Sequence, residues 1–531
     1  MIVKLADVGS LGLNKDVPEH ELSEQPLAWS DVRNMTFRAG LAERVQGYLE
    51  GFDTTPTKAA YGLFSAVKAS GTAFVVAGAT DAAYDYNGTT ENAITGPTIA
   101  ATADTKWSGG ELTGFLVLNE STTDPQFIAV ENLGGSTNLA ALTNWPATTT
   151  CKVLRPFKYY LVAANMTEGG TVYPYKVRWS TAAVPGTLPA NWVASTTNDA
   201  GSIDLSANYG PVVDMLALGD QLVIYRSRGL TVMRHIGGTD AANRLVMAFN
   251  DVPSGSVTGI LALNCVCDIQ SFGHLVLSQS DVYLFDGTTT RSILDKRMRD
   301  WLRNNVDSTN AKRCFVFNHA EQQEAWVCIV ESGKTAATKA IIWNYADNTI
   351  GLRDIPNLTA AVHCPVSEGL GASTYDALDA LNYTYDNVGA VYPTYSSFVS
   401  ESKFRKTVLA STDNKLYVVG NAATENGTAM VGELTREYIS LGDAQRVKLI
   451  RSVWPRLDAG AGQTFEIAIG TSMAVDDPTS WQDAQIYTVG TSRKVDVNRA
   501  GRFMSLRMRC SSGGAWRLRS LDVDAQPQGL Y

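Results

Sequence analysis

The sequence predicts an all-β chain with three parts: an extended N-terminal arm, a β-propeller-like body of short antiparallel hairpins, and a C-terminal antiparallel β-sandwich. Only 18% of the 531 residues are charged, while glycine occurs 45 times, a balance typical of sheets joined by many turns. Hairpins recur between about 220 and 420, which favours a propeller. The alternating runs become longer after about 434, which indicates a separate sandwich.

Residues 1–53 are predicted to form the extended arm. Glycine and proline punctuate short polar pieces, and only Trp29, Met35 and Phe37 offer side chains for burial. Such a segment must lie on another surface, either the body of its own chain or a neighbouring subunit. We select Trp29 and Phe37 as candidate subunit contacts.

The body is predicted to span 54–433 and begins with short apolar strands such as 74–77, 115–118 and 159–162. The stretch 89–108 is rich in threonine and alanine, and we interpret it as a small insertion.

The clearest unit lies between Cys314 and Asn357. Two consecutive hairpins follow from period-two alternation, which predicts four strands running up and down as one blade, with Pro356 ending the last strand. Hairpins of the same kind are predicted at 221–233, 274–285 and 408–419.

One helix is predicted over 295–304, with Asp295 as its N-cap. Its apolar face follows helical spacing and contains Leu294, Met298, Trp301 and Leu302. The opposite face is basic, and it either contacts an acidic partner or is solvated. The candidate partner-facing residues are Lys296, Arg297, Arg299 and Arg303.

Tyrosines recur every ten residues within 372–400, at Tyr375, Tyr385 and Tyr395. Turn residues separate them, which predicts a chain that runs along an outer surface and packs one ring at each step. We select them as candidate subunit contacts. A carbohydrate-binding aromatic row is the alternative.

The C-terminal sandwich is predicted over 434–531. Phe465, Ile467 and Ile469 share one strand face, and Trp516 and Leu518 share another. Arginines alternate with these apolar residues and are expected to face solvent.

Searches for chemical motifs predict no catalytic, cofactor-binding or metal-binding residues, and hence no enzyme. The seven cysteines are scattered and are expected to be buried, reduced thiols. No apolar run approaches the ~20 residues of a membrane span. The net charge of −9 argues against tight nucleic-acid binding.

The opening segment resembles the start of tail hub or nozzle proteins of short-tailed bacteriophages, also called packaged-DNA stabilisation proteins. The residues that carry this resemblance are Gly12, Asp16, Pro18, Glu21, Leu22, Pro26, Trp29, Asp31, Asn34, Phe37, Arg38, Gly40, Glu43 and Gly47. Three further pieces are similar to the same family: the tyrosine repeat, 177–180 with Pro189 and Trp192, and 501–507 with 516–518.

The resemblance implies a homo-hexameric ring below the head-to-tail connector and portal ring of a virion tail, assembled in the host cytoplasm. Such a ring retains packaged DNA, carries tail fibres or spikes, and passes the double-stranded genome through its lumen without sequence-specific binding. The alternative function is a phage-associated propeller that binds or hydrolyses glycans on the host surface.

Overall fold

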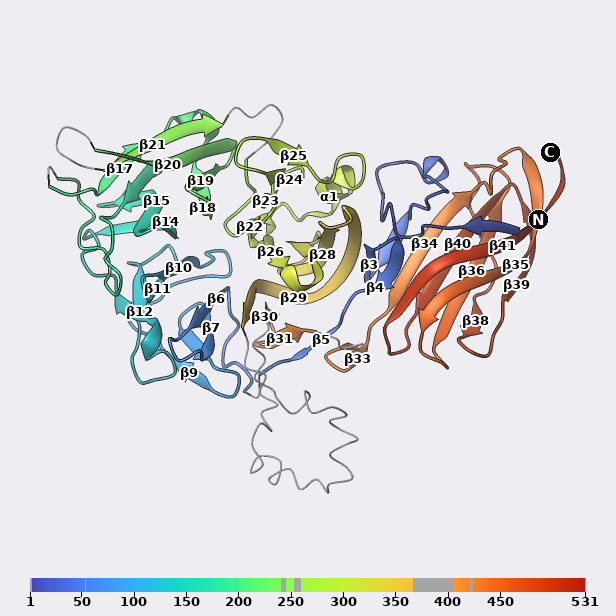
Figure 1. Cartoon of the computed structure of the whole chain (residues 1–531), viewed down its shortest axis with the longest axis horizontal. Coiled ribbons are helices and arrows are strands. Elements are labelled where there is room, and N and C mark those ends of the chain that lie inside the picture. The colour runs from blue at the N-terminus through green and yellow to red at the C-terminus, as the bar shows by residue number, and fades with distance from the viewer. Residues whose placement is uncertain are drawn as a thin grey trace, which may run out of the picture.

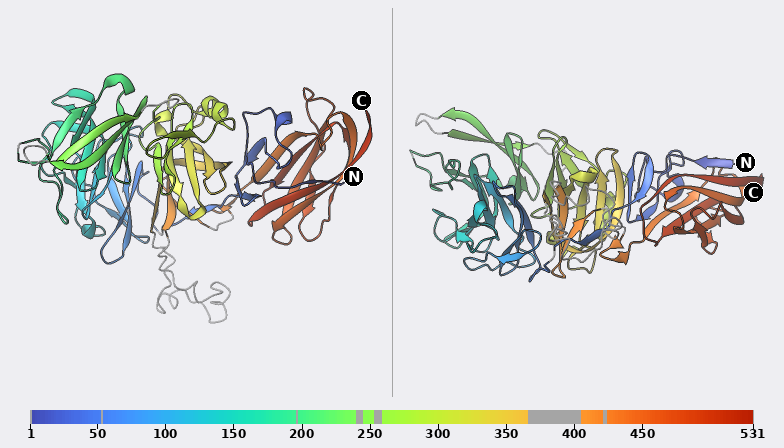
Figure 2. Two further views of the ribbon diagram at one scale, coloured as in Figure 1. Left: turned by 45° about the horizontal axis from the view of Figure 1, so that its top comes forward. Right: turned by 60° about the horizontal axis from the view of Figure 1, so that its bottom comes forward.

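The computed structural model describes residues 2–52, 54–195, 197–239, 245–252, 259–365, 405–420 and 424–530. A propeller and a β-sandwich lie side by side, and strands from the N-terminal segment run between them (Figure 1). The two bodies stay side by side in both turned views (Figure 2). The predicted all-β class is confirmed.

Five blades of the propeller are separate four-stranded antiparallel sheets that follow one another along the chain. The first contains β6 (Gly62–Val67), β7 (Ala73–Gly78), β8 (Ala83–Tyr86) and β9 (Glu91–Ala93). The second contains β10 (Ser108–Leu112), β11 (Phe115–Asn119), β12 (Gln126–Ala129) and β13 (Ala140–Ala141). The third contains β14 (Thr149–Phe157), β15 (Tyr160–Glu168), β16 (Thr171–Trp179) and β17 (Gly201–Asp204). The fourth contains β18 (Val212–Leu218), β19 (Gln221–Arg226), β20 (Gly229–Thr239) and β21 (Leu245–Val252). The fifth contains β22 (Val266–Ile269), β23 (Gly273–Leu277), β24 (Val282–Phe285) and β25 (Thr290–Ser292).

The sixth blade is the hairpin pair that the sequence shows most clearly. It contains β26 (Phe315–His319), β27 (Glu324–Ile329), β28 (Ala337–Asn344) and the first part of β29 (Thr349–Pro365). The four predicted strands are confirmed, and so are the hairpins at 221–233, 274–285 and 408–419.

The predicted end of the last strand at Pro356 is wrong, because β29 continues to Pro365. The register between β28 and β29 shifts just before Leu358. Pro356 therefore lies where no ladder N–H is required, so the strand tolerates it. Beyond this shift, β29 leaves the sixth blade and enters the seventh.

The seventh blade combines distant parts of the chain. The second part of β29 pairs with β30 (Arg405–Ser411), which pairs with β31 (Leu416–Val419). The outer strand is β5 (Tyr48–Glu50), which pairs with β31. The N-terminal segment thus closes the propeller.

Two sheets form the sandwich. One contains β2 (Asp31–Arg33), β34 (Gly432–Ile439), β36 (Thr464–Ser472), β37 (Ser480–Trp481), β38 (Gln485–Thr488) and β40 (Phe503–Cys510). The other contains β1 (Ile2–Leu5), β4 (Leu41–Arg44), β35 (Arg446–Ala459), β39 (Val495–Gly501) and β41 (Trp516–Leu530). The rings of Phe465 and Trp516 meet edge to face at 5.2 Å between the sheets, and both side chains are buried as predicted.

Residues 1–53 are more than an extended arm that lies on another surface, because they contribute strands to both bodies. Five strands form in this segment, among them β3 (Met35–Arg38), which pairs with β4 and contacts β29 at Leu352. Two of the five join the propeller and three join the sandwich. These strands are only three or four residues long, so their own pattern is too short to predict them.

Two smaller expectations also fail. The stretch 89–108 is not a separate insertion, because it contains β9 of the first blade and the start of β10, with Ile94 and Trp107 buried between them. The helix is shorter than 295–304, since α1 spans Arg299–Asn305. Asp295 does not cap it, because Lys296 takes a positive φ of 55° and breaks the turn.

Candidate functional site

The most extensively built polar site is the junction between the propeller and the sandwich, which the N-terminal segment forms. On the propeller side, the Phe37 carbonyl accepts hydrogen bonds from Thr349 at 2.7 Å and from Asn344 at 3.2 Å. The Asp16 carboxylate accepts the Arg299 amide at 2.7 Å and so caps α1 from outside the helix.

The same segment binds the sandwich through buried arginines. Arg436 is 0% exposed and donates to the carbonyls of Leu22 at 2.8 Å and Glu19 at 2.5 Å. Burial lowers the pKa of Arg436 to about 10. Arg44 likewise donates to the carbonyls of Ser512 and Gly514.

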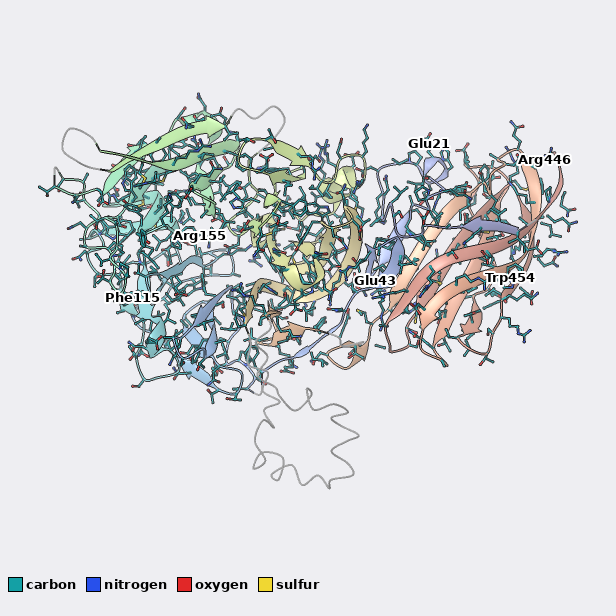
Figure 3. All side chains as sticks on the ribbon, viewed as in Figure 1. Glu21, Glu43, Phe115, Arg155, Arg446 and Trp454 are labelled. Carbon is teal, nitrogen blue, oxygen red and sulfur yellow. The ribbon has the colours of Figure 1, made fainter. Side chains whose placement is uncertain are left out.

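Asn34 contacts both bodies at once. Its side-chain amide donates to the Val431 carbonyl at 2.9 Å, and its side-chain oxygen accepts the Asp354 amide at 2.8 Å. Glu43 extends the junction by pairing with Arg517 of β41 at 2.7 Å. Figure 3 shows Glu43 where the N-terminal strands lie between the two bodies.

Trp29 and Phe37 do not present their side chains to a neighbouring subunit, in contrast to the prediction. Both are 0% exposed within this chain, and the Trp29 indole donates to the Val8 carbonyl at 2.6 Å. The sequence correctly indicates that these side chains need burial, but the surface that buries them is their own chain.

Gly12 explains why the segment can approach the sixth blade closely. Its φ is +68°, and a Cβ there would lie 2.9 Å from the Ile350 carbonyl oxygen. Any other residue would be strained in this conformation and would clash with β29.

A cavity of about 310 Å³ lies within the junction. The propeller contributes His319, Glu324, Trp326 and Arg353 to its wall; the N-terminal segment contributes Thr36, Arg38 and Arg44; and β41 with the residue before it contributes Ala515, Trp516 and Arg517. The cavity therefore has walls from all three parts of the chain.

Glu324 is the buried acid of this cavity. Its carboxylate accepts hydrogen bonds from Thr36 at 2.8 Å, Trp326 at 3.2 Å and Arg38 at 3.1 Å. Burial raises the pKa of Glu324, and the nearby Arg38 charge opposes that shift. Glu324 is thus fully bonded, with Arg38 as its counterion.

Arg353 is a buried arginine of the same cavity, and its guanidinium has no hydrogen-bond partners among the described residues. It is 1% exposed, and its guanidinium lies 4.5 Å from the ring centre of Trp326 and 5.7 Å from that of Tyr48. None of its three guanidinium nitrogens has a hydrogen-bond acceptor among the residues that the structure describes. Burial lowers the pKa of Arg353, and the carboxylates of Glu425 and Glu324 oppose that shift. An uncompensated buried charge costs several kcal/mol.

A second polar cluster lies on the propeller axis. Arg155 of β14 pairs with the fully buried Asp214 of β18 at 3.0 Å and donates to Asn264 at 2.7 Å. Asp214 also accepts the Asn264 amide at 2.8 Å. Three blades are therefore connected around a cavity of about 240 Å³, and Figure 3 shows Arg155 inside the propeller.

Lys106 also connects distant blades. It is 4% exposed and donates to the carbonyls of Cys314 and Leu263, which precede the sixth and fifth blades. Burial lowers the pKa of the Lys106 ammonium.

The predicted basic face around α1 is largely bound within the chain. Arg297 donates to the Asn348 carbonyl at 2.8 Å, Arg299 pairs with Asp281 at 2.9 Å, and Arg303 pairs with Asp300 at 3.3 Å. The Lys296 side chain is exposed. Arg297 and Arg299 are thus structural, while Lys296 and the half-exposed Arg303 stay accessible.

Tyr375, Tyr385 and Tyr395 lie outside the described residues, so their predicted role as subunit contacts stays a prediction. The seven cysteines are buried and free, as predicted. Within the described ranges, no group of three or more metal-ligating side chains forms. The described helices include none long and apolar enough to cross a membrane.

Arg353, Asp214 and Lys106 are among the buried polar residues that sequence reasoning missed. Arg353 ends the run Thr349–Arg353, in which every residue is buried. Strand alternation alone assigns Arg353 to the solvent face, which is why its burial was missed. The available signal of burial was a charged residue next to an otherwise uncharged run.

No protein-family model and no curated protein matches the chain. Among solved structures, it is similar to apo AztD from Citrobacter koseri, at 13% identity over 56% of this chain and 74% of that chain, with a TM-score of 0.33. It is also similar to Sqt1 from Saccharomyces cerevisiae, at 10% identity over 71% of this chain and 99% of that chain, with a TM-score of 0.35. The described strand pairing, rather than these weak similarities, defines the propeller and the sandwich.

Proposed function

We propose that this protein is a structural tail hub or nozzle protein of a short-tailed bacteriophage. In this proposal six copies form a ring below the head-to-tail connector and portal, and the ring retains the packaged genome and later conducts it out. Tail fibres or spikes attach to the outside of the ring. The protein acts through its shape and catalyses no reaction.

One observation carries the proposal: the resemblance and the junction coincide. Asp16, Asn34, Phe37 and Glu43 carry the family resemblance, and each also makes a contact that joins the N-terminal segment to one of the two bodies. The residues that carry the resemblance are thus among those that set the relative position of the bodies. That position is what a ring-forming subunit must fix.

The propeller axis favours a conduit between copies over a conduit through each propeller. Arg155, Asp214 and Asn264 connect three blades there, and the axial cavity of about 240 Å³ has no room for a duplex. The net charge of −9 suits a wall along which DNA slides, because proteins hold DNA by placing cations against its phosphates.

The test is the mass of the assembled protein. Multi-angle light scattering is performed on the full chain alone and after mixing with the connector ring encoded in the same genome. The proposal expects a complex that adds six times 57.2 kDa to the connector. A monomer that never joins the connector, or a map of the intact particle without this chain on the portal axis, would refute it.

The second candidate is a glycan-binding or glycan-hydrolysing propeller, which the regular spacing of Tyr375, Tyr385 and Tyr395 favours. Replacing all three tyrosines by alanine separates the two functions. Loss of binding to, or cleavage of, a host polysaccharide by the variant would support the second candidate. A wild-type protein that neither binds nor cleaves the polysaccharide would exclude it.

A further inference from the structure

The junction cavity contains cations in excess of the anions that could neutralise them. Arg38 pairs with Glu43 at 3.3 Å and with Glu324 at 3.1 Å, and Arg517 pairs with the other oxygen of Glu43 at 2.7 Å. Glu43 is therefore shared between two arginines, and Glu324 is bound by Arg38, Thr36 and Trp326, so neither carboxylate hydrogen-bonds with Arg353.

Two guanidinium groups in this wall retain unused donors. Arg353 has no acceptor for any of its nitrogens among the described residues, and the Nε of Arg44 also lacks one. The two side chains come from different parts of the chain, β29 and β4, and both line the same cavity. An arginine cannot resolve this by losing its proton at any ordinary pH.

The position of Arg353 suits recognition of an oxyanion. The Trp326 ring lies 4.5 Å from the guanidinium, a contact that orients a planar group. Arg353 is 1% exposed, so an anion in the cavity would reach its N–H donors after a small shift of the side chain. Those donors form a fork that matches two oxygens of a carboxylate or phosphate. The cavity volume of about 310 Å³ corresponds to roughly ten water molecules at about 30 Å³ each. A phosphate ion or a short dicarboxylate fits this space.

We propose that the junction cavity is a binding site for a small oxyanion, a phosphate or a carboxylate, held by Arg353 with Arg44 as a second donor. This inference does not depend on the proposed function, since the cavity belongs to a single chain. The bound anion would connect β29 of the propeller to the N-terminal segment and so would stabilise the junction.

Glu425 is the competing internal partner. One of its carboxylate oxygens is buried without a hydrogen bond in the described structure, and its charge acts on Arg353. If Glu425 neutralised Arg353 in solution, the wild type would bind no anion, and Glu425→Gln would weaken the fold and create anion binding. If the site binds an external anion, the wild type already binds it, and Glu425→Gln would strengthen that binding by removing a competing negative charge.

The experiment is calorimetric titration of the full chain with sodium phosphate and, in a second arm, with sodium succinate, at ionic strength held constant with sodium chloride. The two arms identify the class of oxyanion. The wild type is expected to bind one anion per chain and to unfold at a higher temperature in its presence. Arg353→Met is expected to lose at least tenfold in affinity and all anion-dependent thermal stabilisation.

Arg456→Met is the matched control, because Arg456 is an exposed arginine that pairs with Asp522 at 2.8 Å on the sandwich surface. It should bind and respond as the wild type does. Arg353→Lys keeps the charge without the fork and should also bind at least tenfold more weakly, which provides a second variant if Arg353→Met fails to fold. Equal responses of Arg353→Met and wild type, or no binding of either anion beyond the chloride control, would overturn the proposal.

Discussion

Replacing Asp214 by asparagine should destabilise the propeller more than any surface change of the same chemistry. Asp214 is 0% exposed, and its two oxygens accept hydrogen bonds from Arg155, from the Met215 amide at 2.7 Å and from the Asn264 amide at 2.8 Å. Every one of these partners is a donor. In either orientation, the new amide NH₂ of asparagine would face at least two of them.

The magnitude follows from the loss of the counterion. Arg155 would remain at the axis without its carboxylate, and breaking a partly buried pair from one side costs about 3–5 kcal/mol. For a chain of this size the urea m-value is about 3 kcal/mol/M or more, so the unfolding midpoint should fall by about 1 M.

Urea unfolding followed by tryptophan fluorescence measures this difference. Asp220→Asn is the matched control, because Asp220 follows the same strand and pairs with Lys158 at 3.1 Å while 99% exposed. Its midpoint should shift by a few tenths of a molar at most. Removing both charges, with Asp214→Leu and Arg155→Met together, should recover much of the loss. Equal midpoints for Asp214→Asn and Asp220→Asn would refute the reasoning.

Three further predictions concern the junction, the histidines and the thiols. Trp29→Ala should lower the free energy of unfolding by about 3–5 kcal/mol and admit proteolysis between propeller and sandwich; an unchanged digestion pattern would contradict this. The buried His274 accepts from Tyr225 at 2.7 Å and faces the Ala217 carbonyl at 3.0 Å, and burial lowers its pKa to about 4. Stability should therefore fall as the pH drops from about 6.5 toward 4, by about 1.4 kcal/mol per pH unit, and His274→Gln should reduce this slope in urea unfolding. Native protein should not react with a thiol reagent, whereas unfolded protein should expose all seven cysteines; rapid native labelling would be inconsistent with the buried thiols.

The sixth blade could be predicted from the sequence because its pairing is local. Consecutive strands from Phe315 to Arg353 pair with their neighbours in the chain, so apolar alternation and turn residues contain nearly all the information needed. The same holds for the hairpins of the fourth and fifth blades. The strands of the sandwich were predictable from alternation within each strand, as in Phe465, Ile467 and Ile469, although their pairing partners lie farther along the chain.

The role of the N-terminal segment could not be predicted, because its partners are remote. Asn34 bonds with Val431 and Asp354, which lie 397 and 320 positions away. Strands of three residues with polar neighbours contain no period that could indicate such pairing. Only the need of Trp29 and Phe37 for burial was visible.

The junction cavity was missed for a different reason. Sequence rules place arginine in solvent, and Arg353 alternates with Leu352 as if one face of β29 were exposed. Both faces are covered in the structure, by Trp326 and Tyr48 on the side of Arg353. Burial on both sides is a property of the assembled layers and is not encoded in the strand alone.

The pairing of the N-terminal segment with late strands has a consequence for synthesis in the cell. Glu43 and its partner Arg517 are 474 positions apart, so β4 leaves the ribosome long before β41 exists. Until β41 is made, β4 pairs only with β3 and keeps an open edge that invites association with other nascent chains. A chain that ends within the last strands would thus contain every strand of the seventh blade but an incomplete sandwich. Chaperones would have to retain such a chain, or proteases remove it.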